Sequence, residues 1–133
     1  MPRATGTFEV KIDPVELSPV GKQGELGRMT IDKQFSGGIS GTSKGEMLVA
    51  NTPSDGSMSY VALERVTAEV DGRSGSFVLM HNGVMVKSDP SAGEFRVIVV
   101  VGSGTGELTG LSGNMTIRIE GGQHRYEFEY LLP

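Results

Sequence analysis

Alternation of apolar and polar side chains, interrupted by glycine-containing turns, is the feature that most constrains the fold of this chain. Between residues 57 and 70, small or apolar residues occupy nearly every second position. Successive side chains of a strand point to opposite faces, so a period of two predicts β-strands. No long stretch shows the period of an amphipathic helix. We expect eight strands, at residues 5–12, 28–36, 40–51, 57–70, 74–86, 94–101, 113–120 and 124–131.

Short turn signals separate the expected strands. The dipeptides with the strongest hairpin preference are Asp55-Gly56, Asp71-Gly72 and Gly121-Gly122. Hairpins in succession give an antiparallel meander, and eight such strands can close into a barrel without exposed edges. We therefore predict an all-β fold, an eight-stranded antiparallel meander closed into a barrel. The interior of such a barrel is either filled by side chains or holds one small ligand.

Four connections depart from this rhythm. We expect the loops at residues 13–27 and 87–93, which contain proline and glycine, to flank a mouth of the barrel. Residues 107–111 are expected to form a single helical turn. The connection at Gly37-Gly38 needs a bulge or an odd number of residues, because a two-residue turn would place the apolar residues of its two strands on opposite faces.

Length, charge and cysteine content limit the possible functions. The 133 residues form one domain, residues 1–133. A net charge of −4 argues against nucleic acid, since binding to a phosphate backbone depends on clustered lysines and arginines. The longest apolar run, residues 97–101, is far shorter than the ~20 residues of a membrane-spanning helix. Neither cysteines nor an apolar signal segment are present, so we expect no disulfide, no thiol nucleophile and a cytoplasmic location.

The expected hairpin at Asp71-Gly72 brings an acid and an imidazole together. Glu64 lies on the strand face that carries small and apolar residues, and we expect this face to line the interior. With a four-residue loop Glu64 lies opposite His81, and with a two-residue loop the two are diagonal neighbours. Either register places the side chains within reach of each other.

Further residues on the interior face complete the expected site. Centring the preceding turn on Asp55-Gly56 pairs Glu64 with Met47. Apolar walls then surround the acid and the imidazole. The expected ligand-contacting residues are Tyr60, Met47, Phe77 and Leu79.

Two interpretations of the acid and the imidazole stay open. A carboxyl group within apolar walls should have a raised pKa, so Glu64 and His81 can act as a general acid and base, with the Tyr60 hydroxyl binding a ligand oxygen. Alternatively, the two side chains satisfy each other and fix the register of the strands without any catalytic role.

Other motifs give weaker indications. A metal site needs three or more converging ligands, and only His81 and His124 are available as histidines, so we expect neither a metal nor another cofactor. The glycines at 102, 104 and 106 predict a tight crossing between strands rather than a phosphate-binding loop, since no βαβ unit surrounds them. A two-residue turn at Gly121-Gly122 pairs Ile117 with Tyr126 and leaves the charged residues of that hairpin outside.

Several segments resemble known families. The Gly-Thr-Gly-x-hydrophobic pattern within residues 101–113 resembles the signature of allene oxide cyclase-type and dirigent-type β-barrels. Residues 3–11, 62–67 and 72–79 closely resemble a family of small, mostly bacterial proteins that share this barrel and have no assigned function. That family supplies the motif positions Glu64, Arg65, Gly75, Phe77 and His81. The resemblance implies an allene oxide cyclase-like barrel and favours a ligand in its lumen.

Three functions remain open at this point. The first is binding of a small apolar or oxygenated molecule in a lumenal cavity of roughly 300 Å³ or more. The second is a cyclase or isomerase activity that uses Glu64 and His81 as acid and base. The third is a filled, non-catalytic barrel that acts as a structural or interaction protein through an exposed apolar patch. We also expect the chain to form a homo-oligomer.

Overall fold

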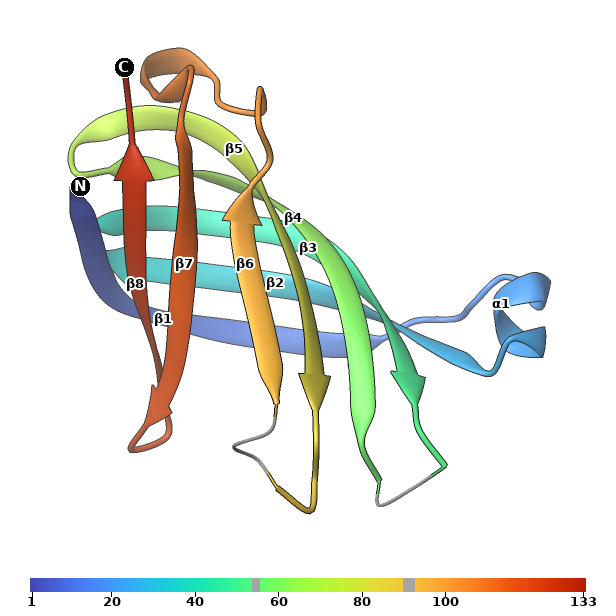
Figure 1. Cartoon of the computed structure of the whole chain (residues 1–133). Coiled ribbons are helices and arrows are strands. Elements are labelled where there is room, and N and C mark those ends of the chain that lie inside the picture. Colours follow the sequence, from blue (N-terminus) through green and yellow to red (C-terminus); the bar gives the residue numbers. More distant parts are fainter. Residues whose placement is uncertain (54–55, 90–92) are drawn as a thin grey trace.

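The computed structural model describes residues 1–53, 56–89 and 93–133, and its strands form one closed antiparallel barrel (Figure 1). Strands follow one another around the barrel in chain order, and the last one pairs with the first. This arrangement confirms the predicted all-β meander and its eight strands within the described residues. The strands are β1 (Arg3–Pro14), β2 (Leu26–Gly37), β3 (Ile39–Asn51), β4 (Met58–Val70), β5 (Arg73–Met85), β6 (Glu94–Val99), β7 (Ser112–Glu120) and β8 (Gln123–Leu131).

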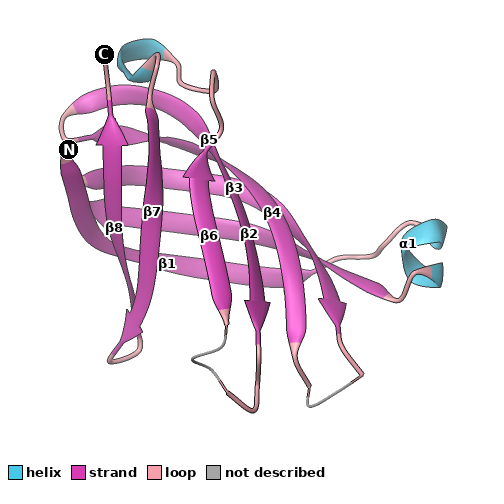
Figure 2. Ribbon diagram, in the orientation of Figure 1, coloured by secondary structure: helices cyan, strands magenta, loops and turns pink. Residues whose placement is uncertain are grey.

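Within residues 1–53, 56–89 and 93–133, helical structure is confined to two short elements (Figure 2). The 3-10 turn η2 (Gly106–Leu108) confirms the helical turn expected near residues 107–111. The helix α1 (Pro19–Gln23) lies in the loop between β1 and β2 and was not predicted. Its signal was present in the sequence, because the hydroxyl of Ser18 caps the helix by accepting from the backbone N of Gly21 at 3.1 Å. No helix among the described residues is long and apolar enough to cross a membrane.

Turn geometry sets the register on each side of the barrel. Asp71 and Gly72 form a two-residue turn with positive φ at both positions, 47° and 87°, the backbone form that suits the twist of a hairpin. The Gly121-Gly122 turn behaves in the same way and pairs Ile117 with Tyr126, as predicted. The β2–β3 connection is the expected odd-length one, since Gly38 alone lies between the two strands.

One predicted register is wrong. Glu64 lies opposite Gly45 rather than Met47, and Met47 pairs with Ala62. The shift is two residues, so each side chain keeps its predicted face of the sheet. The predicted turn centre is Asp55-Gly56, and Asp55 lies outside the described residues.

One end of the barrel is closed by a packed core. The rings of Phe77 and Phe128 stack with centroids 5.9 Å apart, and Phe128 stacks on Tyr130 at 5.4 Å. Leu108 and Leu111, from the segment that follows β6, are buried in the same core. This segment therefore covers the end of the barrel at which β4 turns into β5 (Figure 1).

The glycine-rich segment reaches this position because glycines allow backbone contact. A Cβ atom on Gly75 of β5 would lie 2.1 Å from the carbonyl oxygen of Thr105. Beyond the end of β6, side-chain hydroxyls add to the backbone hydrogen bonds with β5: Thr105 accepts from the backbone N of Ser76 and Ser103 from that of Val78, each at 3.0 Å. Within the segment, Gly102 and Gly106 have positive φ, 85° and 59°, so they allow the tight crossing that the sequence predicts.

The opposite end of the barrel is open and apolar. The strand alternation turns several apolar side chains there toward the barrel axis, yet they remain exposed to solvent. Register links them to interior neighbours, since Ile12 pairs with the buried Ile31 and Phe95 with Gly83. The exposed inward-facing residues are Ile12 (46%), Met85 (48%), Phe95 (58%) and Ile119 (70%).

Candidate functional site

A buried polar cluster lies between the closed core and the open end. Four adjacent strands each contribute one inward-facing side chain, and none of the four is more than 5% exposed. They are Lys33 of β2, Ser43 of β3, Glu64 of β4 and His81 of β5. Gly45 makes room for the carboxylate, because a Cβ atom there would lie 2.6 Å from the Cβ of Glu64.

The Glu64 carboxylate is the centre of this cluster. Its Oε2 lies 3.0 Å from Lys33 Nζ and 2.7 Å from His81 Nε2. Its Oε1 accepts a hydrogen bond from the Ser43 hydroxyl at 2.8 Å. Each oxygen of the carboxylate therefore has a positive or hydrogen-bonding neighbour, as a buried charge requires.

The pKa of Glu64 is lowered, so the predicted raised value is wrong. Burial alone raises the pKa, but the contact with His81 and the positive charge of Lys33 outweigh burial and bring it to about 2. The side chain is consequently ionised at neutral pH and cannot serve as a general acid there.

Lys33, which together with His81 lowers the pKa of Glu64, was not predicted from the sequence. A signal was available, because Lys33 alternates with Ile31 and Phe35 on the interior face of β2. A lysine between two apolar inward positions needs a negative partner. Its ammonium also lies 4.6 Å from the centroid of the Phe8 ring and 5.8 Å from that of Phe35, within range of cation–π attraction.

His81 contacts the Glu64 carboxylate with one ring nitrogen and lies near Tyr60 with the other. The two-residue turn places Glu64 opposite Leu79 and His81 opposite Ala62, so Glu64 and His81 are diagonal neighbours, one of the two predicted arrangements. Although Nε2 is close to Glu64, it has no well-aligned hydrogen bond among the described residues. The other ring nitrogen, Nδ1, lies 3.4 Å from the hydroxyl of Tyr60.

Tyr60 stands between His81 and solvent. Its ring meets the imidazole edge-on with centroids 5.6 Å apart and lies beside Phe95 at 6.4 Å. Gly83 leaves room for the rings of Tyr60 and Phe95, since a Cβ atom there would lie 2.6 Å from a carbon of each ring. Burial and the negative charge of Glu64 raise the pKa of Tyr60, so its phenol stays protonated and can donate a hydrogen bond.

The other predicted site residues lie at two different depths. Met47 is partly exposed and pairs with Ala62 near the cluster. Phe77 and Leu79 are fully buried, Phe77 within the aromatic stack of the closed end. His124 packs on Phe8 with ring centroids 5.0 Å apart. Among the described residues, no three His, Asp or Glu side chains converge as metal ligands would.

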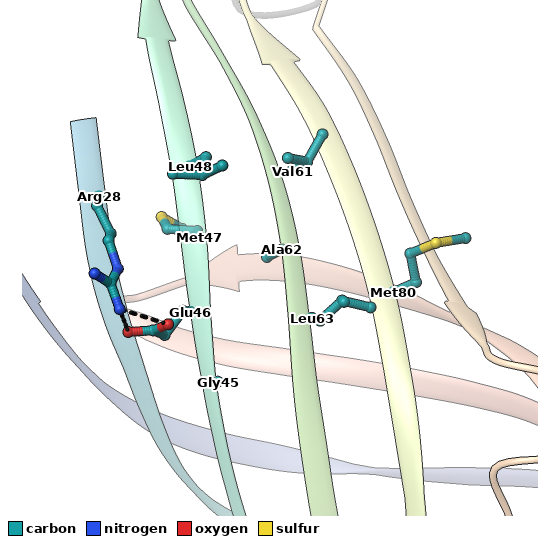
Figure 3. A pocket seen from close by; sticks show the side chains of 9 residues that line it. All are labelled: Arg28, Gly45, Glu46, Met47, Leu48, Val61, Ala62, Leu63 and Met80. Atoms are coloured by element: carbon teal, nitrogen blue, oxygen red, sulfur yellow. Dashed lines mark hydrogen bonds and ion pairs between the residues drawn. The ribbon is translucent and has the colours of Figure 1, made fainter. Parts of the chain in front are cut away.

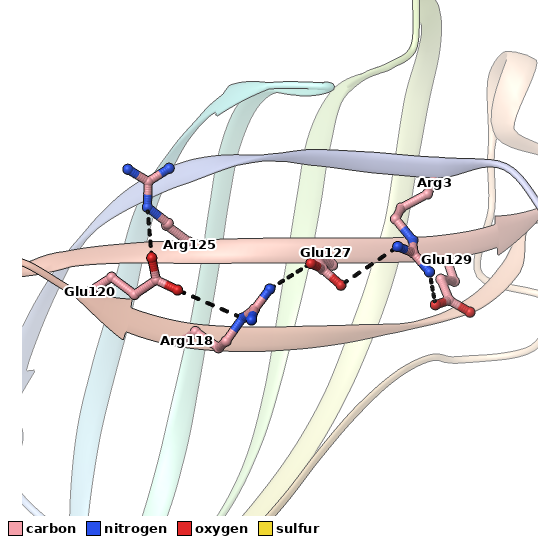
Figure 4. A network of polar contacts seen from close by, with 6 residues as sticks. All are labelled: Arg3, Arg118, Glu120, Arg125, Glu127 and Glu129. Carbon is pink, nitrogen blue, oxygen red and sulfur yellow. Dashed lines mark hydrogen bonds and ion pairs between the residues drawn. The ribbon is translucent and has the colours of Figure 1, made fainter.

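Two contrasting surfaces cover the outside of the barrel. Across β3, β4 and β5, outward-facing apolar side chains line a shallow hollow of about 650 Å³, with Arg28 and Glu46 at its border (Figure 3). Across β1, β7 and β8, the outer face carries a network of alternating charges (Figure 4). Its shortest contacts join Arg118 to Glu127 at 2.6 Å and Arg3 to Glu129 at 2.8 Å. These exposed pairs contribute little to stability individually.

Comparison with known proteins identifies the family. A family model described as a protein of unknown function, DUF3224, matches residues 4–130. The chain belongs to the DUF3224 family. The crystal structure of a DUF3224 protein of unknown function from Shewanella oneidensis MR-1 is similar, with a TM-score of 0.89 and 46% identity over 100% of this chain and 98% of that one. No curated protein matches the sequence. The predicted resemblance to a barrel family without assigned function is thereby confirmed.

Proposed function

We propose that this DUF3224 protein binds a small, uncharged and mostly apolar molecule in the open end of its barrel. The observation that carries the proposal is the set of exposed, inward-facing side chains Ile12, Met85, Phe95 and Ile119. Exposed apolar groups release water when a ligand covers them, and this release favours binding.

The charge balance of the buried cluster supports an uncharged ligand. Lys33 and Glu64 neutralise each other at 3.0 Å, and the pair is fully enclosed. A carboxylate or an amine on the ligand would lose its hydration without gaining a free countercharge in this cluster. Among ligands of similar shape, the uncharged one should therefore bind most tightly.

The hydroxyl of Tyr60 supplies a polar anchor at the bottom of the apolar opening. Tyr60 as a residue is partly exposed, its phenol stays protonated, and its hydroxyl lies 3.4 Å from Nδ1 of His81. A ketone or alcohol oxygen on the ligand can accept its hydrogen bond. The preferred ligand thus has an apolar body and one oxygen.

Binding of three probes of equal chain length tests this proposal. A medium-chain methyl ketone should bind more tightly than the corresponding alkane and the corresponding carboxylate, as measured by calorimetry or by amide chemical shifts. Tyr60→Phe retains the ring and removes the hydroxyl, so it should weaken ketone binding about 2- to 10-fold and leave alkane binding unchanged. Tightest binding of the carboxylate, or shifts confined to the outer face of the barrel, would contradict the proposal.

A second candidate, an isomerase, is favoured by the continuous contact from Glu64 through His81 to Tyr60. In this scheme His81 takes a proton from the carbon beside a ligand carbonyl, and the carbonyl electrons shift onto an oxygen held by Tyr60. Glu64 stays ionised and stabilises the imidazolium that forms. The predicted acid and base pair thus becomes His81 with Tyr60, and Glu64 becomes the counterion.

Hydrogen exchange separates the isomerase from the binding protein. The bound ketone should take up deuterium from heavy water beside its carbonyl in the wild type, and His81→Gln should reduce the rate at least ~100-fold. Mass spectrometry of the recovered ketone measures the uptake. Binding without any uptake would leave the binding function and eliminate the isomerase.

A further inference from the structure

The outer face of the barrel carries an apolar surface that the lumenal site does not use. Leu48 on β3, Val61 and Leu63 on β4, and Met80 on β5 point away from the barrel axis and are 42–56% exposed. We call these four residues the outer apolar face. Cross-strand pairing makes it continuous, because Leu48 pairs with Val61 and Leu63 with Met80. Figure 3 shows the four side chains lining the outer hollow.

Such a surface is unusual for the water-facing side of a strand. Outward positions alternate with buried ones, so they are expected to carry polar residues, as they do across β1, β7 and β8 (Figure 4). Neighbouring exposed apolar side chains of this size indicate a surface that another molecule covers. The two faces differ within one barrel, so the apolar residues are concentrated in one place.

The border of the face indicates which molecule covers it. Arg28 and Glu46 lie together at one edge, where an arginine nitrogen is 2.7 and 3.0 Å from the two carboxylate oxygens. Both side chains remain substantially exposed. One positive and one negative charge at the same edge make this edge complementary to a copy of itself, as a symmetric interface requires.

We propose that the outer apolar face is the interface of a two-fold symmetric homodimer. The two-fold axis lies between the two faces and runs across β4 at the level of Ala62, so Val61 of one copy meets Leu63 of the other. The same axis sets the two Arg28 and Glu46 pairs side by side in opposite order, so unlike charges meet. The inward-facing residues of the open end take no part, and the lumenal site stays accessible in both copies.

Analytical ultracentrifugation tests the interface. The wild type should sediment with twice the mass of one chain, and Leu63→Glu should raise the dimer dissociation constant at least ~30-fold, because it buries a charge at the centre of the face. Val101→Glu is the matched control, since Val101 is 89% exposed, lies in the turn after β6 and should not affect the mass. Circular dichroism verifies that each variant remains folded.

Exchange of the border charges gives a second, independent criterion. Arg28→Glu places like charges together and should weaken the dimer, whereas Arg28→Glu combined with Glu46→Arg should restore it. A wild type that stays monomeric at high concentration overturns the proposal. So does an oligomer whose mass is unchanged by Leu63→Glu. Ligand binding in the open end is measured separately, so the two proposals can fail independently.

Discussion

At the scale of single residues, the buried ion pair of Lys33 and Glu64 determines the protonation state of the interior carboxylate and thus its possible chemistry. The sequence correctly predicts that Glu64 and His81 meet, because alternation and a two-residue turn determine their positions. It does not give the pKa of Glu64, which depends on the contact with His81 and also on Lys33, two strands away along the barrel wall. The direction of a pKa shift follows from all charges around a group, and long-range neighbours emerge only when the barrel closes.

A double-mutant cycle measures the strength of the buried pair. Glu64→Gln leaves the Lys33 ammonium buried without its countercharge, and Lys33→Met leaves the carboxylate with only His81 and Ser43 as partners. Each single variant should therefore lose ~3–5 kcal/mol of unfolding free energy, while the double variant recovers a large part of the loss. Urea denaturation of the four proteins gives the coupling energy.

The exposed pair of Arg118 and Glu127 provides the control cycle. Its contact distance of 2.6 Å is as short as any in the buried cluster, but both side chains are solvent-accessible. The equivalent cycle there should give a coupling energy of only ~0.2–1 kcal/mol. Equal coupling energies in the two cycles would show that burial does not strengthen the interaction of Lys33 with Glu64.

At the scale of elements, the turn dipeptides predicted where the hairpins lie but not every strand register. Asp71-Gly72 and Gly121-Gly122 fixed their registers because each needs two consecutive residues with positive φ. The β3–β4 connection also contains a hairpin dipeptide, Asp55-Gly56, yet the register predicted from it is two residues off. The helix α1 was not predicted because its single turn is too short to show helical periodicity, although Ser18 and Pro19 mark its start.

At the scale of the whole molecule, the strand count predicts a barrel but not its two unlike ends. Both ends have the same alternating pattern, so periodicity alone cannot tell a packed interior from an open one. The difference arises from the segment after β6, whose leucines enter one end only. A function at the open end thus depends on a closed end that holds the strands in place.

Acid stability tests how the whole barrel depends on its buried cluster. The pKa of Glu64 in the folded protein, about 2, lies below its ordinary value of 4.5, so the ionised carboxylate stabilises the fold above pH 4.5. This stabilisation, on the order of 3 kcal/mol, is lost as the pH falls through 4.5 toward 2. The unfolding free energy of the wild type should therefore fall more steeply across this window than that of Glu64→Gln, in which no group titrates at this position. Urea titrations at a series of pH values measure both slopes, and parallel slopes would mean that Glu64 has the same pKa in the folded and unfolded chains.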